Sequence, residues 1–127
     1  MRHLHYYLYM IIHSGTYSRI LSTALFEKVL QEIDAKITNS SNPKKLIMFS
    51  GHDTNISPSL HFLNLSNFQC IEDIWQKKPL DKYLNCEDGP GFASNLIIEV
   101  RQDGQSEPYI QVLYNGKQMN LCDRYSK

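Results

Sequence analysis

The sequence feature that most constrains the fold is an unbroken apolar run, Leu46-Ile47-Met48-Phe49. No polar residue alternates with these four, so the pattern predicts a strand that is buried on both faces. Such a strand needs neighbouring strands on both edges and helices over both faces of its sheet. The run therefore indicates an interior strand of a layered α/β structure.

The rest of the chain predicts few elements with which to complete that sheet. Leu21, Leu25, Val29 and Ile33 recur every four residues, which predicts an amphipathic helix over about 17–37. The pattern predicts further helices over about 54–63 and 71–76 and strands over 96–100 and 109–114. Three strands and about three helices are too few to cover a doubly buried strand. We therefore expect α/β class and an incomplete sheet.

Length and charge narrow the function classes. The chain has 127 residues, which allows one domain, and its 13 Lys plus Arg balance 13 Asp plus Glu. A chain without net charge lacks the basic surface of a general nucleic-acid binder. No run reaches the roughly 18 apolar residues of a membrane span. The apolar segment 6–12 is short and has no small-residue cleavage site after it, so it predicts a buried strand or helix edge rather than a signal peptide.

The three cysteines form no C-x-x-C pair, which excludes zinc-ribbon and thioredoxin-type motifs. Cys70 and Cys86 could close a short loop, and a structural disulfide fits them better than a nucleophilic role because no base is evidently placed beside either. Cys122 is left without an evident partner. Three N-glycosylation patterns begin at Asn39, Asn55 and Asn64. The cysteines and the N-glycosylation patterns together favour a secretory compartment.

Other groups that carry chemistry have simpler interpretations. The N-terminal histidines have no acidic partner nearby, so a solvated face fits them better than a metal site; they are His3, His5 and His13. His61 fits a packing or surface position on the helix over 54–63. Trp75 with its neighbouring lysines fits a solvated loop with one anchoring aromatic ring. The sequence predicts no cofactor and no metal.

The strongest candidate site follows the apolar run directly, at Ser50-Gly51-His52-Asp53-Thr54. In open α/β sheets, ligands bind beyond the carboxyl ends of strands, where helix N-termini favour anions. There His52 could donate a hydrogen bond to a phosphate oxygen, and Asp53 could deliver a proton to a leaving oxygen. The alternative is that Asp53 is only a helix N-cap beside a surface histidine.

Three segments in order give the chain a resemblance to the C-terminal part of the histidine acid phosphatase family. Leu46 to Thr54 resembles that family's strand followed by its His-Asp motif. Residues 90–100, from Pro90-Gly91-Phe92-Ala93-Ser94 into Leu96 to Val100, are similar to its Pro-x-aromatic-Ala-Ser strand. Residues 109–116 resemble its last hairpin strand. The resemblance covers about residues 17–122, and we take 1–127 as a single partial domain.

This resemblance implies a portion of a phosphoglycerate-mutase-like sheet sandwiched by helices. It implies hydrolysis of phosphate monoesters through a phosphohistidine, with His52 contacting the phosphate and Asp53 as general acid. The family's nucleophile lies in an Arg-His-Gly-x-Arg-x-Pro motif, whereas Arg2-His3 is followed here by Leu4-His5. The chain thus has no nucleophile of its own.

Two functional expectations follow. The first is a phosphatase portion that is inactive alone and needs the N-terminal half of the same domain. The second is a non-catalytic remnant or interaction module of the same fold. The family implies a secretory, lysosomal or extracellular location.

Overall fold

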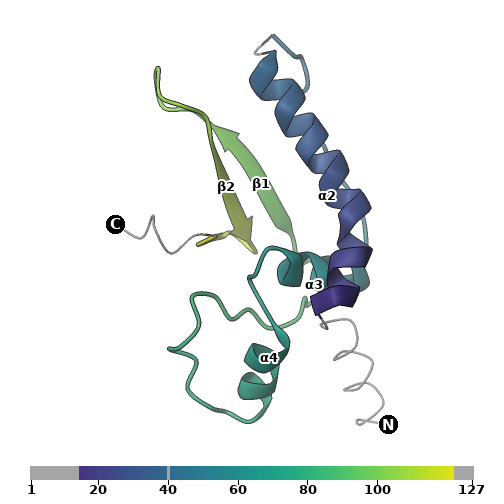
Figure 1. Cartoon of the computed structure of the whole chain (residues 1–127), viewed down its shortest axis with the longest axis vertical. Helices are drawn as coiled ribbons and strands as arrows, with labels where there is room; N and C mark the ends of the chain where they lie inside the picture. The colour runs from purple at the N-terminus through teal and green to yellow at the C-terminus, as the bar shows by residue number, and fades with distance from the viewer. Residues whose placement is uncertain (1–14, 40, 122–127) are drawn as a thin grey trace.

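The computed structural model describes residues 15–39 and 41–121. In chain order the elements are α2 (Gly15–Thr38), α3 (Asp53–Phe62), α4 (Phe68–Trp75), β1 (Leu96–Arg101), β2 (Tyr109–Tyr114) and β3 (Lys117–Met119) (Figure 1). All three predicted helices and the strands over 96–100 and 109–114 are confirmed. Segment 6–12, the three N-terminal histidines and Cys122 lie outside the described residues.

Helix α2 buries a different stripe from the one its leucines predict. The buried residues are Ser18, Ser22, Phe26 and Ile33. Leu21 is 47% exposed, and Leu25 and Val29 are only partly buried. The reason is that α2 packs along one side on α3, where the rings of Phe26 and Phe62 stack 4.3 Å apart. The predicted leucine face is therefore only half covered.

The sheet is a small antiparallel meander in the order β1-β2-β3. Leu96 lies opposite Tyr114, and Arg101 lies opposite Tyr109. Asn115 and Gly116 turn β2 into β3 with φ values of 49° and 78°, and positive φ at both central residues is what a two-residue hairpin turn requires. Strand β3 was not predicted, because three residues are too short to show an alternating pattern.

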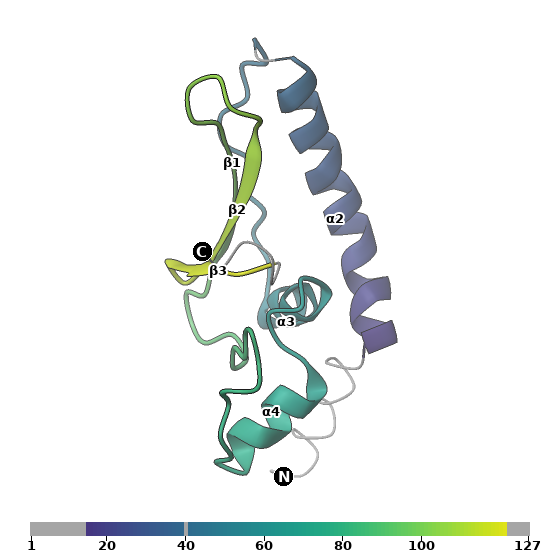
Figure 2. The same ribbon diagram turned by 60° about the vertical axis from the view of Figure 1, so that its left-hand side comes forward.

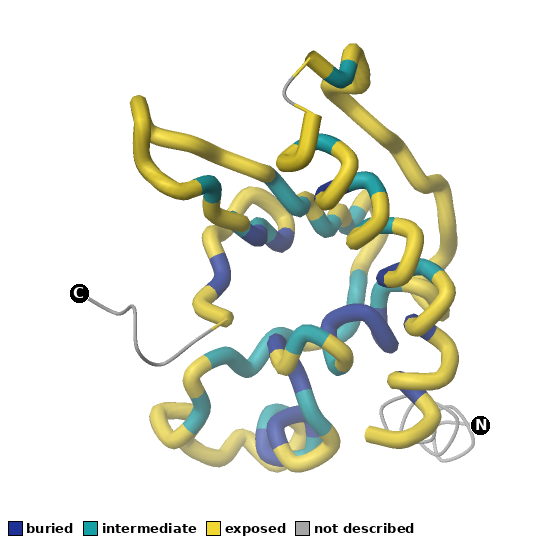
Figure 3. Tube along the Cα trace, turned by 45° about the horizontal axis from the view of Figure 1, so that its top comes forward, coloured by how far each residue is buried: buried dark blue, intermediate teal, exposed yellow. Residues whose placement is uncertain are grey.

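The main core lies where this sheet packs on α3. Its buried members are Leu60, Leu65, Val112, Tyr114 and Met119. Figure 3 shows the buried positions in several small groups that are separated by exposed stretches of chain. The molecule therefore has a thin core for its length.

The prediction of a buried strand at 46–49 is wrong for this structure. The segment forms no strand and runs from the far end of α2 back to the start of α3, as Figure 2 shows. Leu46 and Met48 are 79% and 81% exposed. The ion pair of Lys44 with Glu32 of α2 (2.9 Å) holds the chain just before the segment against α2. No strand in the described part of the chain pairs with it, so the apolar run stays outside the sheet.

Taken together, the helices and the small antiparallel sheet make a mixed α/β structure that is incomplete. The described residues provide neither the second strand edge nor the covering helices that the apolar run requires. The expectation of an incomplete α/β fold is confirmed, although the strand that led to it is unpaired.

Helix α4 and the loop after it form a separate small unit closed by a disulfide. The bond between Cys70 and Cys86 confirms the pairing that the sequence suggested. The loop returns to the core where Glu87 N–H donates to the Leu65 carbonyl (3.0 Å) and Ser66 Oγ donates to the Glu87 carbonyl (2.8 Å).

Candidate functional site

The candidate site lies at the N-terminus of α3, directly after the unpaired apolar segment. His52 is the N-cap residue, with extended backbone angles (φ −117°, ψ 173°). Its N–H donates to Asn55 Oδ1 (2.9 Å), and its carbonyl accepts from the Asn55 and Ile56 N–H groups (2.9 and 3.2 Å). The helix therefore starts at a defined residue, and Asn55 holds that start in place.

Asp53 is the first residue of the helix and not its cap, so the N-cap alternative is wrong. One carboxylate oxygen accepts from the Thr54 N–H at 2.8 Å. A negative charge in the first turn is favourable to the helix dipole. His52 and Asp53 are both exposed to solvent, so both side chains are open to a ligand.

Gly51 is required for space at this point. A Cβ on Gly51 would lie 2.9 Å from Asn55 Oδ1 and 3.3 Å from its Cγ. The Asn55 carboxamide thus rests on the backbone of the loop that carries His52. A side chain at position 51 would push away the group that caps the helix.

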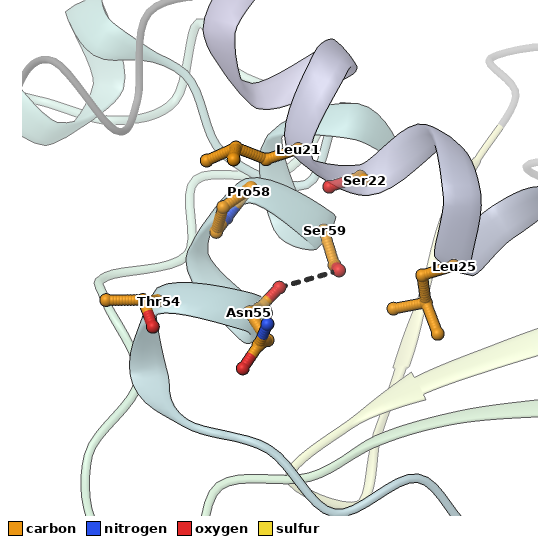
Figure 4. Close-up of a pocket in the computed structure, with 7 residues that line it drawn as sticks. All are labelled: Leu21, Ser22, Leu25, Thr54, Asn55, Pro58 and Ser59. Carbon is orange, nitrogen blue, oxygen red and sulfur yellow. Dashed lines mark hydrogen bonds between the residues drawn. The ribbon is translucent and has the colours of Figure 1, made fainter.

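A small cavity lies behind the site, between α2 and α3, and encloses about 70 Å³. Figure 4 shows its walls: Leu21, Ser22 and Leu25 from α2, and Thr54, Asn55, Pro58 and Ser59 from α3. Ligand pockets are typically several-fold larger, on the order of 300 Å³ or more. Because neither His52 nor Asp53 lines it, this cavity is not a substrate pocket.

His61 lies more than two helical turns beyond His52 and is partly buried, so the packing interpretation of this residue is confirmed. Burial lowers the pKa of His61, and the nearby Arg19 charge lowers it further. His61 therefore favours its neutral form in the α2–α3 contact, and the fold does not bring it to the site.

The remaining ionisable groups form no second site of this kind. Within 15–39 and 41–121 there is no group of three or more His, Cys, Asp or Glu placed to hold a metal ion. Trp75 is the last residue of α4 and is 58% exposed, so the expectation of an anchoring aromatic ring in a loop is wrong.

Two residues that stabilise the structure were not identified from the sequence. Asn55 stands three residues after His52, the spacing of a capping box, so this pattern could have been found. Asp73 is 1% exposed on α4 and accepts from Tyr83 Oη and pairs with Lys82 Nζ, both at 2.6 Å. No local pattern indicates that Asp73 is buried, because its partners come from the loop.

The fold and the site define an α/β protein whose Gly-His-Asp-Thr segment places an acid and an imidazole at a helix N-terminus. The family described as the histidine phosphatase superfamily (branch 2) matches residues 3–115, and the chain belongs to this superfamily. The superfamily includes phosphatases and mutases. No curated protein and no solved structure matches the chain. None of the helices in the described residues is long and apolar enough to span a membrane.

Proposed function

We propose that this chain carries the His-Asp half of a phosphomonoester-hydrolysing site of the histidine acid phosphatase type. The observation that supports this most directly is the position of His52 and Asp53, both open to solvent at the N-terminus of α3. Membership of the histidine phosphatase superfamily supports a phosphate ester as the substrate.

In this proposal the two residues have separate tasks. His52 donates a hydrogen bond to a phosphate oxygen, and the positive end of the α3 helix dipole adds positive potential there. Asp53 protonates the leaving alcohol oxygen as its bond to phosphorus breaks. A carboxyl group can do this only while protonated, which acidic medium or burial beneath a second half of the site favours.

A second half of the site is needed because the described site holds no nucleophile. Phosphoryl transfer depends mainly on positioning and on charge stabilisation of the three phosphate oxygens. The histidine nucleophile and the arginines of the family motif would come from the N-terminal half of the same domain. The exposed run Leu46 to Phe49 supports this requirement, because it presents an apolar strand-like segment immediately before His52.

The first experiment is to determine the mass and peptide coverage of the native protein from its source cells and to assay its phosphatase activity. We expect a product longer than 14.8 kDa that contains an upstream Arg-His-Gly motif and hydrolyses 4-nitrophenyl phosphate at acidic pH. The 127-residue chain, assayed beside it, should show no turnover.

Two results would contradict the proposal in different ways. Turnover by the 127 residues alone would contradict the need for a second half. A native product of 14.8 kDa without turnover would contradict the phosphatase function and favour the interaction module of the same fold.

A further inference from the structure

We propose that Asn55 is a positioning residue for the His52–Asp53 pair, and that its carboxamide sets the geometry of both side chains without touching the substrate. The inference rests on the proposed phosphatase function and adds a third residue to the same site. Two observations carry it. The carboxamide holds the backbone of His52, and within the described residues the Asp53 carboxylate is held only by the helix start itself.

Asn55 holds the His52 backbone from both sides. Its Oδ1 accepts the His52 N–H at 2.9 Å, and its own N–H donates to the His52 carbonyl at 2.9 Å. These two bonds fix the extended angles of His52 (φ −117°, ψ 173°) at the point where the chain enters the helix. Because the backbone angles set the direction of the Cα–Cβ bond, they decide where the imidazole points.

Asp53 has no support from another element in the part of the chain that the structure describes. Its carboxylate has one hydrogen bond there, from the Thr54 N–H at 2.8 Å, which belongs to the same helical turn. The carboxylate therefore moves with the start of α3. A displacement of about 1 Å in a catalytic group costs on the order of 10²-fold in rate, so a small shift of the helix start is enough to lower turnover.

The Asn55 carboxamide is itself confined. A Cβ placed on Gly51 would lie 2.9 Å from Asn55 Oδ1 and 3.4 Å from Asn55 Cβ, so the side chain lies directly over the glycine backbone. On its other side Asn55 lines the small cavity, opposite Leu21 and Ser22 of α2 (Figure 4). Shortening this side chain would extend the cavity toward the loop and remove the acceptor of the His52 N–H.

The alternative is that Asn55 only caps the helix. Helix α4 offers a matched control for this alternative, because its N-cap is also an asparagine whose Oδ1 accepts a backbone N–H at 2.9 Å, from Asn67 to Cys70. Loss of either carboxamide leaves one N–H at a helix start without its partner, so the two losses should destabilise the protein similarly. Asn67 lies outside the candidate site, so only the loss of Asn55 should change turnover.

The test measures kcat of the native enzyme at its full length for an alkyl phosphate and for 4-nitrophenyl phosphate. We expect Asn55→Ala to lower kcat for the alkyl phosphate by about 10²-fold. The loss for 4-nitrophenyl phosphate should be smaller, because its leaving group does not need the Asp53 proton. Asn67→Ala should leave both kcat values unchanged. Asn55→Asp retains an oxygen acceptor for the His52 N–H, so it should restore the parent's ratio of the two kcat values.

A second variant displaces the same carboxamide without changing position 55. The methyl group of Gly51→Ala would meet Asn55 Oδ1 at 2.9 Å, so this variant should show the same selective loss even where Asn55→Ala does not fold. Equal losses for the two substrates, or the same loss in Asn67→Ala as in Asn55→Ala, would overturn the role of Asn55 and leave the phosphatase function standing. A parent enzyme without turnover would overturn the phosphatase function and this inference with it.

Discussion

At the start of α3 a single carboxamide organises the candidate site. Asn55 holds the His52 N–H at 2.9 Å and rests on Gly51, so the orientation of His52 and Asp53 depends on a residue without a proposed chemical role. The His-Asp pair itself was predictable, because it follows an apolar run and precedes a helix. The space required at Gly51 was not, since it depends on where the Asn55 side chain turns.

The first prediction concerns Gly51→Ala. The new methyl group must displace Asn55 from the helix start, and loss of such a cap costs about 1 kcal/mol of folding free energy. Urea unfolding followed by circular dichroism measures this loss. Gly91→Ala is the control, because a Cβ on Gly91 meets nothing within 4 Å. Equal stability of the two variants would contradict the structural role assigned to Asn55.

The second prediction concerns Asp53→Asn in the complete enzyme. Loss of a general acid should lower kcat by about 10²- to 10⁴-fold for an alkyl phosphate, whose leaving group needs a proton. The loss should be much smaller for 4-nitrophenyl phosphate, whose leaving group does not. Asp88→Asn is the control, since Asp88 is also exposed and also accepts the N–H of the next residue (2.7 Å). Equal losses for both substrates would rule out the proton-donor role of Asp53.

At the scale of elements, α4 and its loop are held by one charge cluster and one disulfide. Asp73 accepts from Tyr83 and Gln69 and pairs with Lys82, which places a nearly fully buried carboxylate where the loop turns back. The helix was predictable from its apolar pattern. The conformation of the loop was not predictable, because contacts between residues 4 to 16 positions apart create it.

The third prediction concerns the pH dependence of stability. The Lys82 ammonium first, and then the Tyr83 hydroxyl, hold the pKa of Asp73 well below its ordinary value of 3.8. The folded state therefore favours the ionised form, and this contribution is fully present above pH 3.8 and is lost as pH falls through the lower folded pKa. Thermal unfolding should show Asp73→Asn less stable than the parent at neutral pH, with the difference shrinking in acid. Asp81→Asn, an exposed position in the same loop, should show no such trend.

The fourth prediction concerns the disulfide. Cys70 and Cys86 are 16 residues apart, and closing a loop of that length stabilises a fold by about 3 kcal/mol. In a Cys122→Ser background, which prevents mispairing, replacing both cysteines by Ser should lower the free energy of urea unfolding by this amount. A reductant should destabilise the parent and leave the double variant unchanged. A reductant effect of equal size on both proteins would contradict this assignment.

At the scale of the whole molecule, the described chain buries several small clusters rather than one continuous core. Three strands and three helices leave one side of α2 and the segment 46–49 uncovered. An exposed apolar segment with an unpaired backbone is a predicted aggregation site. This arrangement is consistent with an incomplete α/β fold of the histidine phosphatase superfamily.

The fifth prediction concerns that segment. Because Leu46 and Met48 are 79% and 81% exposed, changing both to Lys should leave the helix content of the 127-residue chain unchanged and reduce its aggregation. In the complete enzyme the same changes should abolish folding or turnover, because the two side chains would then be buried. Leu84→Lys, in the disulfide loop, is the control. Full activity of the double Lys variant would show that no second half covers the segment.

Local pattern by itself determined much of this protein: the helices, the strands over 96–100 and 109–114, and the position of His52 and Asp53 between an apolar run and a helix. Side-chain spacing and turn residues act over a few positions, so the sequence expresses them directly. The tertiary structure decided which stripe of α2 is buried, where Asp73 finds its partners and that Leu46 to Phe49 stays unpaired. These outcomes depend on which surfaces are available to pack against, and no local pattern contains that information.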